Sequence, residues 1–305
     1  MRYSIIIPHK NTPQLLQRLL DSIPQRDDLE VIVVDDNSDP SIVDFCHYPG
    51  KDRPNIHLIF TTEDRGAGYA RNVGMDNSRG EWIVFADADD FFVTSNLNDI
   101  LNSNIPDSCD VLMWETFWKT SDTPIEGFQS TSFDGNFIPK HDAPDAFITN
   151  VAPWARMIRK SAIEKFHLRF EEQQHANDVM FTARLSFHIH DYLYTTTVVY
   201  IYDNSFSFLT KQINAKTIAQ RYNTLIRSSR YAYDLLGLKT RGEQLLHIDY
   251  TRFLLYTAWG VIRMGYGKMM LAYRAACADA GYSTVPYKTK IKLFLIKWRI
   301  AKFQS

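Results

Sequence analysis

Cysteine and long hydrophobic runs are scarce in this chain of 305 residues. The three cysteines, Cys46, Cys109 and Cys277, form no CxxC pair, which excludes a disulfide scaffold and a cysteine-rich zinc site and is typical of a reducing compartment. No apolar run approaches the roughly 18 residues that span a bilayer, and the first residues lack the apolar stretch of a secretory signal. We therefore expect a cytoplasmic protein without a transmembrane helix.

Several catalytic signatures are also absent. The chain has no HExxH pair and no GxSxG, SxxK or Cys/His signature, which argues against a zinc protease and against an enzyme with a nucleophilic side chain. The glycine-rich segment 66–74 is not a GxGxxG loop, because its third glycine comes too late and it does not follow the first strand. We interpret this segment as the start of a helix that packs close to a strand.

The net charge of −1 hides an uneven distribution of charge. Residues 1–205 carry 17 Lys and Arg against 31 Asp and Glu, whereas residues 206–305 carry 17 against 4. An acidic part suits a metal or a hydroxylated substrate, and a basic part suits a surface that bears phosphate, such as nucleic acid or an anionic membrane. Since no nucleic-acid-binding module accompanies the basic charge, we expect no nucleic acid partner.

Strands and helices alternate along the first 200 residues. Hydrophobic runs predict strands at residues 3–7, 31–34, 56–60, 82–85, 111–114 and 193–202. Helical spacing and capping residues predict helices after Thr12 and Pro13 and at residues 66–76, 154–166 and 178–188, a hairpin or loop at 125–137, and a helical pattern from about residue 209 onward. Alternation of this kind is typical of βαβ units, so we expect an α/β fold with a mainly parallel sheet.

Acidic residues follow two of the predicted strands directly. Asp35 and Asp36 come at the end of the second strand, and Asp87, Asp89 and Asp90 come after the fourth. Ligands of open α/β sheets bind at the carboxyl ends of the strands, so we expect the two acidic groups to face one site.

Asp87 and Asp89 can act together on a cation. In an extended segment, residues two apart point to the same side, and carboxylate oxygens suit Mg²⁺ or Mn²⁺, which also take phosphate oxygens and water. The alternative is a solvated acidic turn that caps the next helix. For Asp36, a hydrogen bond to a base or a ribose competes with a turn formed together with Asn37 or Ser38.

Two further positions are open to a functional and a structural interpretation. Arg71 is either an exposed residue of a helix or a partner of the carboxylates or of a diphosphate. Asp178, which follows Asn177, is either the N-terminal cap of the helix at 178–188 or a general base placed over a cleft.

Four segments of the first 90 residues carry a resemblance to a known family. They are SIIIPHKN at 4–11, VVDDNS at 33–38, GAGYARNVG at 66–74 and GEWIVFADADD at 80–90. Their order and spacing resemble those of the motifs of family 2 glycosyltransferases. Further on, WARMIRK at 154–160 resembles the family's segment before the acceptor site, FEE at 170–172 with NDVMF at 177–181 resembles its "ED" motif, and residues 200–207 resemble its last strand.

This resemblance implies a fold and a reaction. The fold would be GT-A, a Rossmann-like, mainly parallel sheet flanked by helices over residues 1–207, with a nucleotide-sugar half at about 1–110, an acceptor half at about 111–207 and a basic helical region at 208–305. The reaction would be metal-dependent, inverting hexosyl or N-acetylhexosaminyl transfer from a nucleotide-sugar donor, expected to be a UDP-sugar, to a hydroxyl of a glycan or lipid-linked acceptor in polysaccharide assembly of the capsule or O-antigen type. The cofactor would be Mn²⁺ or Mg²⁺.

The resemblance also implies roles for single residues. It places Pro8 and Asp36 at the nucleotide, Arg71 and Asp87 at the nucleotide-sugar, Asp89 at the metal and the diphosphate, Asp178 as the base, and Trp154 and Asn177 on the acceptor side. Two positions depart from the family pattern, because Lys10 replaces the usual aromatic residue and Asn177 the usual Glu before the base.

Two alternatives to a transferase share parts of this pattern. A sugar-nucleotide pyrophosphorylase has the same α/β layout, but the chain lacks the glycine-rich, lysine-bearing loop that such an enzyme carries after its first strand. A non-catalytic protein that binds a nucleotide-sugar is the other alternative, since an acidic cleft also serves recognition alone.

The C-terminal segment 287–303 has six Lys and Arg and no acidic residue. Its apolar side chains include Phe294 and Trp298. Such a segment is either a helix packed on the catalytic domain with its lysine stems along apolar surface or an attachment to an anionic membrane. With a lipid-linked acceptor, we expect a peripheral protein on the inner face of the cytoplasmic membrane.

Overall fold

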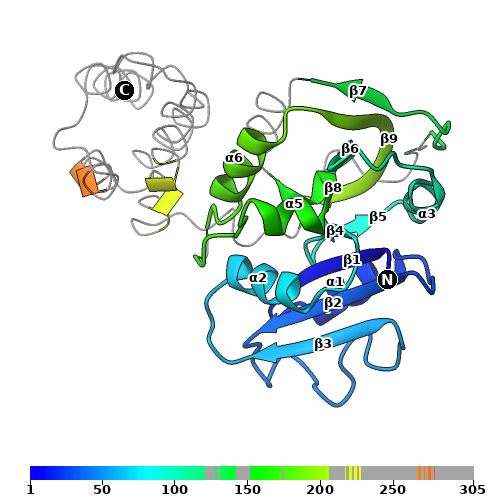
Figure 1. Cartoon of the computed structure of the whole chain (residues 1–305). Helices are drawn as coiled ribbons and strands as arrows, with labels where there is room; N and C mark the ends of the chain where they lie inside the picture. The colour runs from blue at the N-terminus through cyan, green and yellow to red at the C-terminus, as the bar shows by residue number, and fades with distance from the viewer. Residues whose placement is uncertain are drawn as a thin grey trace, which may run out of the picture. The chain divides into compact units, whose positions relative to one another are not determined.

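The computed structural model describes residues 1–120, 128, 131–141, 152–173 and 175–205, together with single residues between 217 and 278 (Figure 1). The chain divides into two compact units, Met1–Ser207 and Phe208–Ser305. Residues 287–303 and most of the helical region expected after residue 209 lie outside the described residues, as do residues 125–127 and 129–130 of the hairpin or loop expected at 125–137. Within the described part of the chain, no helix is both long enough and apolar enough to cross a membrane.

A nine-stranded sheet forms the centre of the first unit. Its strands are β1 (Tyr3–His9), β2 (Leu29–Asp36), β3 (Ile56–Thr61), β4 (Trp82–Phe85), β5 (Phe91–Phe92), β6 (Val111–Lys119), β7 (Ile138–Lys140), β8 (Arg156–Arg159) and β9 (Tyr192–Asp203). The order is β3-β2-β1-β4-β8-β6-β9-β5, and β7 pairs with β9.

The strand directions place the carboxyl ends of six strands together. β1 is parallel to β2 and β4, and β2 is parallel to β3. β8 is antiparallel to both β4 and β6, and β6 is parallel to β9. β1, β2, β3, β4, β6 and β9 therefore point the same way, and their last residues lie at what we call the carboxyl end of the sheet.

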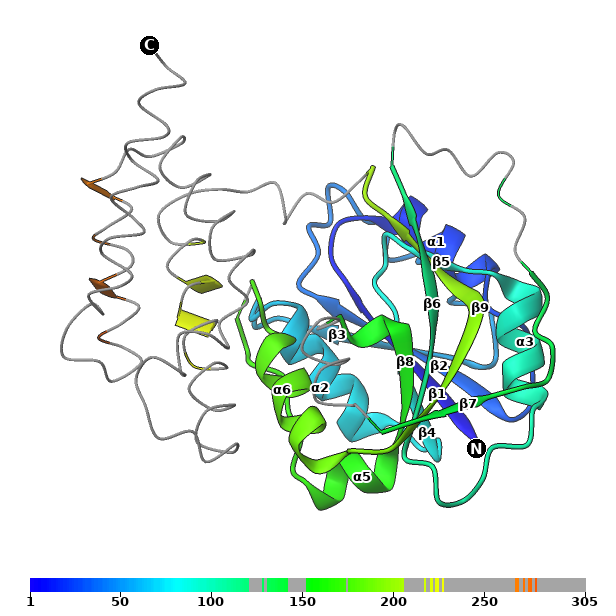
Figure 2. The ribbon, with the colours of Figure 1, turned by 90° about the horizontal axis from the view of Figure 1, so that it is seen from above.

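Helices cover both faces of this sheet. Figure 2 shows α1 (Pro13–Asp21) and α3 (Thr94–Asn102) on one side and α2 (Ala67–Asn77), α5 (Lys160–Lys165) and α6 (Val179–His188) on the other. Side chains of a strand alternate between the two faces, so Ile5 and Ile7 of β1 join the core beneath α1 while Ile6 joins the core beneath α2. The predicted α/β fold is confirmed, and its sheet is buried on both faces.

The first helix begins where the sequence indicates. Pro13 occupies the first turn of α1, and Leu16, Leu19 and Leu20 are buried against the sheet. Thr12 stands at the N-cap position but makes no side-chain capping hydrogen bond. The start of the helix thus depends on the φ angle that proline fixes and on burial of the leucine face.

The helix expected at 154–166 is wrong in its first half. Residues Pro153–Ala155 form a short 3-10 helix (η1), Arg156–Arg159 form the strand β8, and only Lys160–Lys165 are α-helical. The segment RMIR is buried and pairs with β4 on one side and β6 on the other. Pairing on both sides supplies backbone hydrogen bonds that override the local helical pattern.

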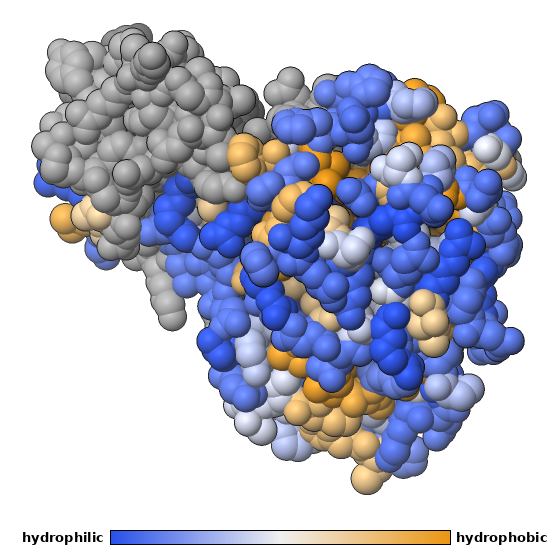
Figure 3. Space-filling model, in the orientation of Figure 1, coloured by the Kyte–Doolittle hydropathy of each residue, from blue (hydrophilic) through white to orange (hydrophobic). Residues whose placement is uncertain are grey.

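The exposed surface is mostly hydrophilic. On the face of the first unit that Figure 3 shows, hydrophobic residues gather in separate patches among charged ones. Large hydrophobic side chains that are exposed include Ile42, Phe60, Trp118 and Phe187. Trp118 lies near the end of β6, which runs to Lys119 and is longer than the predicted strand at 111–114.

Candidate active site

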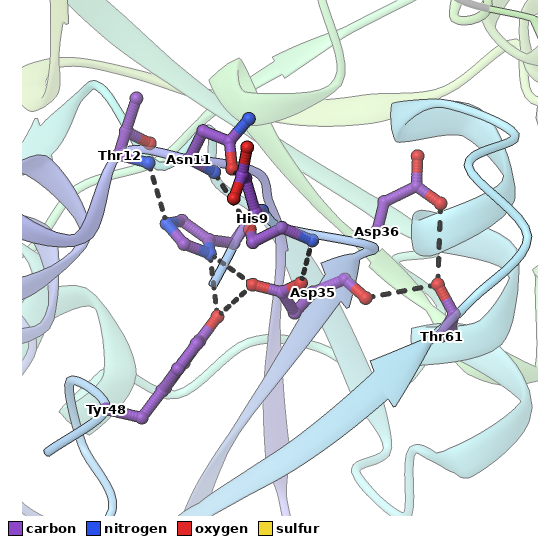
Figure 4. Close-up of polar contacts among 9 residues, drawn as sticks. His9, Asn11, Thr12, Asp35, Asp36, Tyr48 and Thr61 are labelled. Carbon is purple, nitrogen blue, oxygen red and sulfur yellow. Dashed lines mark hydrogen bonds and ion pairs between the residues drawn. The ribbon is translucent and has the colours of Figure 1, made fainter. Parts of the chain in front are cut away.

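A buried hydrogen-bonded cluster fixes the loops that follow β1 and β2 (Figure 4). Asp35 Oδ2 lies 2.9 Å from His9 Nδ1 and accepts a hydrogen bond from the Tyr48 hydroxyl at 2.8 Å. The Thr12 N–H donates to His9 Nε2 at 3.2 Å, so the ring proton is assigned to Nδ1. Burial raises the pKa of Asp35, but hydrogen bonds from His9, Ser38 and Tyr48 outweigh it and leave the pKa lowered.

Asp36, the residue expected at the nucleotide base, ties the end of β2 to the turn before α2. Its carboxylate accepts hydrogen bonds from the Gly66 N–H at 2.7 Å, the Arg65 N–H at 3.2 Å and the Thr61 hydroxyl at 3.4 Å (Figure 4 shows the last). Gly66 has a φ of 91°, which favours glycine. The turn considered for this segment is made by Asp35, which accepts from the Ser38 N–H, and Asp36 keeps a carboxylate at the carboxyl end of the sheet.

The acidic segment after β4 is anchored to β9 through its last member. Asp90 is fully buried, and its carboxylate accepts hydrogen bonds from the Tyr200 hydroxyl and the Asp203 N–H, each at 2.8 Å. The Asp87 N–H in turn donates to the Tyr200 hydroxyl oxygen at 2.9 Å. Burial, with the charges of Asp87 and Asp89, raises the pKa of Asp90 well above its ordinary value. Asp90 therefore anchors the segment, while Asp87 and Asp89 are only partly buried.

Asp89 is held in a strongly acidic environment. Burial and the neighbouring carboxylate of Asp87 raise the pKa of Asp89 to about 6. The Arg18 guanidinium donates to the Asp89 backbone carbonyl and to Asp203 Oδ2, the latter at 2.8 Å. The Asp89 carboxylate thus lies where a positive charge would be stabilised.

This arrangement predicts that metal-free Asp89→Asn is more thermostable than the wild type. The folded pKa exceeds the ordinary value, so Asp89 makes no contribution below about pH 4, weakens folding increasingly up to about pH 6, and costs a constant amount above it. A shift of this size corresponds to on the order of 3 kcal/mol, or a rise in Tm of about 6–12 °C. Melting of both proteins in EDTA from pH 4 to 8 measures the difference in Tm. A difference that does not change with pH would contradict the raised pKa of Asp89.

Arg71 joins the acidic segment to the loop before α6. The residue is only 5% exposed. Its guanidinium pairs with Asp87 and donates to Asn177 Oδ1 at 2.7 Å, and it lies over the Phe170 ring. The expectation that Arg71 is either exposed or a partner of the carboxylates is thereby decided in favour of the carboxylates. It links the two halves of the site, because Asn177 directly precedes Asp178.

Gly68 allows the loop at residues 171–177 to approach the first turn of α2. A Cβ atom on Gly68 would lie 1.9 Å from the Glu171 carbonyl oxygen and 2.9 Å from Asn177 Cβ. The loop is itself closed by a hydrogen bond from the Glu171 N–H to the Asn177 carbonyl at 3.1 Å. A side chain at position 68 would therefore displace the loop that carries Asn177 and Asp178.

Gly68→Ala is accordingly expected to destabilise the protein. Overpacking of this kind costs about 1–3 kcal/mol, which lowers the Tm by several degrees and misplaces the loop before α6. Gly267→Ala is the matched control, since no atom lies within 4 Å of a Cβ there. Equal melting temperatures for Gly68→Ala and the wild type would show that the loop yields without cost.

Asp178 stands at the N-cap position of α6, but its carboxylate makes no capping hydrogen bond to that helix. Its charge acts instead on Arg156, the first residue of β8. Burial lowers the pKa of Arg156 to about 10, and the negative charge of Asp178 opposes that shift. Asp178 therefore lies close enough to a buried guanidinium to interact with it electrostatically, directly after the loop that Arg71 holds.

Trp154 lies at the same end of the sheet, in η1 just before β8. It is buried, and its ring stacks on Tyr200 at 5.0 Å between centroids and on Tyr202 at 5.5 Å. Since the Tyr200 hydroxyl also binds Asp90, Trp154 is connected to the acidic segment through a single side chain. Trp154 therefore supports the site from behind Tyr202, which is more exposed.

The side chains present fit a divalent cation that is shared with a substrate. Among the described residues, no three His, Cys, Asp or Glu side chains are grouped as a complete metal site. Mg²⁺ and similar ions are often held by one or two carboxylates, with substrate phosphates and water as the other ligands. Asp89, with its raised pKa, and the partly exposed Asp87 can supply such carboxylates.

The family of the chain follows from comparison with known proteins. The family description "Glycosyl transferase family 2" matches residues 4–166, more than half of the sequence. The chain belongs to glycosyl transferase family 2. The match includes Pro8, Asp36, Arg71, Asp87 and Asp89, the five residues expected at the nucleotide-sugar, and ends before the loop that carries Asp178.

Two relatives of this family 2 protein illustrate the range of the match. "Uncharacterized glycosyltransferase YibD" of Escherichia coli is 25% identical over 234 residues, which are 72% of this chain and 67% of that protein. The "Poly(ribitol-phosphate) beta-N-acetylglucosaminyltransferase TarS" of Staphylococcus aureus is 25% identical over 226 residues, 70% of this chain. The match spans only 36% of the length of TarS.

Solved structures show the fold of the family 2 protein. The structure of S. aureus TarS 1-349 in complex with UDP-GlcNAc aligns with a TM-score of 0.59 at 16% identity, covering 92% of this chain and 89% of that one. The mannosyltransferase PcManGT from Pyrobaculum calidifontis, in complex with GDP-Man and Mn²⁺, aligns with a TM-score of 0.50 at 17% identity, covering 95% and 78%. The GT-A fold expected from the sequence motifs is confirmed.

Several residues that shape the site were not assigned to it by the sequence analysis. Tyr200, Arg18 and Asp203 contact the acidic segment from β9 and α1, more than 70 positions away. Tyr48, which completes the cluster around His9 and Asp35, lies in an irregular loop. A hydrophobic run that ends in an acidic residue, as β9 does at Asp203, is the one pattern that could have drawn attention to this group.

Proposed function

We propose that the chain is an inverting glycosyltransferase that moves a sugar from a UDP-sugar to a hydroxyl of a glycan or lipid-linked acceptor during polysaccharide assembly. The observation that carries this proposal is the bridge made by Arg71. It pairs with Asp87 on the donor side and with Asn177 on the acceptor side, and so joins the segment of Asp87 and Asp89 to the loop that leads directly into Asp178. A transferase needs both a donor site and a base that acts on the acceptor, whereas a protein that only binds a nucleotide needs no base.

On the donor side, we assign the nucleotide to the loops after β1 and β2. Pro8 lies in β1 opposite Val34, and Asp36 lies at the end of β2. The buried cluster of His9, Asp35 and Tyr48 holds these loops in one shape before a ligand arrives, which reduces the entropy lost on binding. The UDP-GlcNAc bound to TarS supports a UDP-sugar as donor.

On the diphosphate, we assign Asp89 to a divalent cation, Mn²⁺ or Mg²⁺. Such a cation, when bound, neutralises the charge that develops on the leaving nucleoside diphosphate. Asp87 would contact the ribose or the transferred sugar, with Arg71 fixing its orientation. The Mn²⁺ in the PcManGT complex supports this assignment.

On the acceptor side, we assign Asp178 as the general base. An acceptor hydroxyl is a poor nucleophile until a carboxylate takes its proton. Asp178 would receive that proton while the hydroxyl oxygen forms its bond to the anomeric carbon and the nucleoside diphosphate leaves from the opposite side, which inverts the configuration. Asn177 and Trp154 would shape the acceptor side, the first through Arg71 and the second through Tyr200.

Nucleotide release from a donor panel tests this function. The panel contains UDP-glucose, UDP-N-acetylglucosamine, UDP-galactose and GDP-mannose with Mn²⁺, and the acceptors are p-nitrophenyl glycosides and ribitol-phosphate oligomers, the latter suggested by the relatives named for poly(ribitol-phosphate). We expect UDP release that an acceptor accelerates. Release of pyrophosphate from a nucleoside triphosphate and a sugar phosphate would indicate a pyrophosphorylase, and a thermal shift with no release would indicate a binding protein.

We also propose that residues 287–303 attach the enzyme to an anionic membrane. The support is compositional: six cations and no acid, beside aromatic and aliphatic side chains. Reversing Lys292, Arg299 and Lys302 to Glu is expected to weaken binding to phosphatidylglycerol vesicles by at least about 10²-fold, because each cation near an anionic leaflet adds on the order of 1 kcal/mol. Co-sedimentation with vesicles measures this, and equal binding of the variant and the wild type would exclude the attachment.

A further inference from the structure

An aromatic cluster occupies the carboxyl end of the sheet beyond the acidic segment. It consists of Trp118 from β6, Tyr200 and Tyr202 from β9, and Trp154 from η1. Figures 1 and 2 show β6 and β9 running side by side, and Trp118 and Tyr202 are direct partners in the register of the two strands. The members of the cluster therefore come from three separate parts of the chain and are brought together only by the sheet.

The four rings form two layers. Trp154 and Tyr200 make the lower layer, stacked at 5.0 Å with an interplanar angle of 11°, and both are buried. Trp118 and the partly exposed Tyr202 make the upper layer. The centroid of the Trp118 ring lies 4.6 Å from that of Tyr202 and 6.0 Å from that of Trp154. Trp118 nevertheless remains 58% exposed, while its neighbours fix its position.

The lower layer is bonded to the donor side of the site. The Tyr200 hydroxyl donates to Asp90 and accepts from the Asp87 N–H. At the other side of the cluster, Lys119 Nζ donates to Asp203 Oδ2 at 2.7 Å. Trp118 thus belongs to a surface that is connected to the acidic segment through Tyr200 and has the partly exposed Lys119 beside it.

We propose that Trp118 and Tyr202 form a platform on which a pyranose ring of the acceptor saccharide stacks. This inference rests on the proposed function, because it assigns the acceptor of that reaction to the saccharide class. A pyranose presents a face of C–H groups that packs on an aromatic ring, while its hydroxyls at the rim need polar partners such as the Tyr202 hydroxyl and the partly exposed Lys119. A large aromatic side chain that is fixed by stacking and yet exposed is what such a ligand requires.

The occupant is distinguished from other ligands by its shape and charge. An open-chain polyol such as ribitol has hydroxyls but no flat C–H face, so it gains little from stacking. A phosphate-bearing chain would need cations, and the charge of Lys119, the residue after Trp118 in β6, is balanced by Asp203. The platform therefore favours a ring over an open polyol.

Fluorine NMR of the full chain labelled with 5-fluorotryptophan tests the proposal without a donor. Six tryptophan signals are expected, and the one that disappears in Trp118→Phe is assigned to Trp118. Cellobiose is expected to shift this signal in a saturable way, and ribitol at the same concentration is not. Because the measurement needs no nucleotide-sugar, failure of the proposed transferase activity and failure of the platform are read separately.

Variants decide whether the shift reports stacking. Trp118→Ala is expected to weaken cellobiose binding by about tenfold or more, followed by saturation-transfer NMR, and Trp118→Phe by less, since a smaller ring remains. Phe60→Ala, which removes another exposed aromatic residue on the distant strand β3, is the control and should leave binding unchanged. If cellobiose shifts no tryptophan signal, or binds Trp118→Ala as well as the wild type with both proteins melting at the same temperature, the platform proposal is overturned.

Discussion

Replacing Asp178 with Asn is expected to lower the rate of UDP release in the presence of acceptor by about 10²- to 10⁴-fold. The two side chains are nearly the same size, so the fold should persist, but the amide cannot take the proton of the acceptor hydroxyl. Because the Asp178 carboxylate makes no capping hydrogen bond to α6, the loss of about 1 kcal/mol that follows removal of a cap is not expected here.

The measurement separates a base from a structural residue. Turnover is followed by UDP release, and donor affinity is followed by titration of UDP-sugar against the Asp178→Asn variant, where little change is expected. Asp99→Asn, an exposed substitution of the same kind on α3, serves as the control. If Asp178→Asn keeps its rate and loses melting temperature, Asp178 is a helix-stabilising residue and the general base lies elsewhere.

The second large effect concerns Asp89. Asp89→Ala is expected to lower turnover by at least about 10²-fold, since charge stabilisation by a bound metal contributes several kcal/mol to the transition state. EDTA should inactivate the wild type to a similar extent. Mn²⁺ added in excess should restore the wild type and should leave the variant inactive, because the variant lacks the carboxylate that holds the ion.

The pair of readouts makes this prediction specific for the metal. Asp107→Ala removes a fully exposed carboxylate that contacts Arg159, the partner of the first residue of β4, whereas Asp89 follows the last residue of that strand. This variant should behave like the wild type in both EDTA and Mn²⁺. Full activity of Asp89→Ala, or a wild type that works equally well in EDTA, would remove Asp89 from the role of metal ligand. The stability gain expected for metal-free Asp89→Asn would then remain as a separate consequence of its buried charge.

The charges around Arg71 explain why Asn can stand at position 177, where the family pattern has Glu. Arg71 donates to the Asn177 amide oxygen and pairs with one carboxylate, that of Asp87. A Glu at 177 would compete with Asp87 for the positive charge of Arg71 and would add a negative charge beside Asp178. The amide keeps the geometric link between the two halves of the site while leaving the charge of Arg71 to Asp87.

The strands, and the end of the sheet at which the acidic residues lie, follow from the sequence alone. Continuous runs of β-branched residues, as in β1 and β2, are stable only when buried on both faces, which requires a sheet covered by helices. Asp36, Asp87 and Asp89 follow such runs directly, so their place at the carboxyl end was set by local order along the chain. The motif resemblance added the family and the GT-A fold, and both are confirmed.

Only the tertiary structure decided how these residues are held. The pattern of Arg156–Arg159 suits a helix as well as a strand, and the segment is a strand because it pairs with β4 on one side and β6 on the other. Arg71 looks like a surface residue of α2 until the loop at 171–177, about 100 positions later, packs over it. The hydrogen bond from Tyr200 to Asp90 and the position of Trp118 beside Tyr202 likewise depend on contacts between distant segments. Local sequence specifies backbone preference and burial, whereas the pairing of charges and rings between distant segments exists only once the sheet has brought them together.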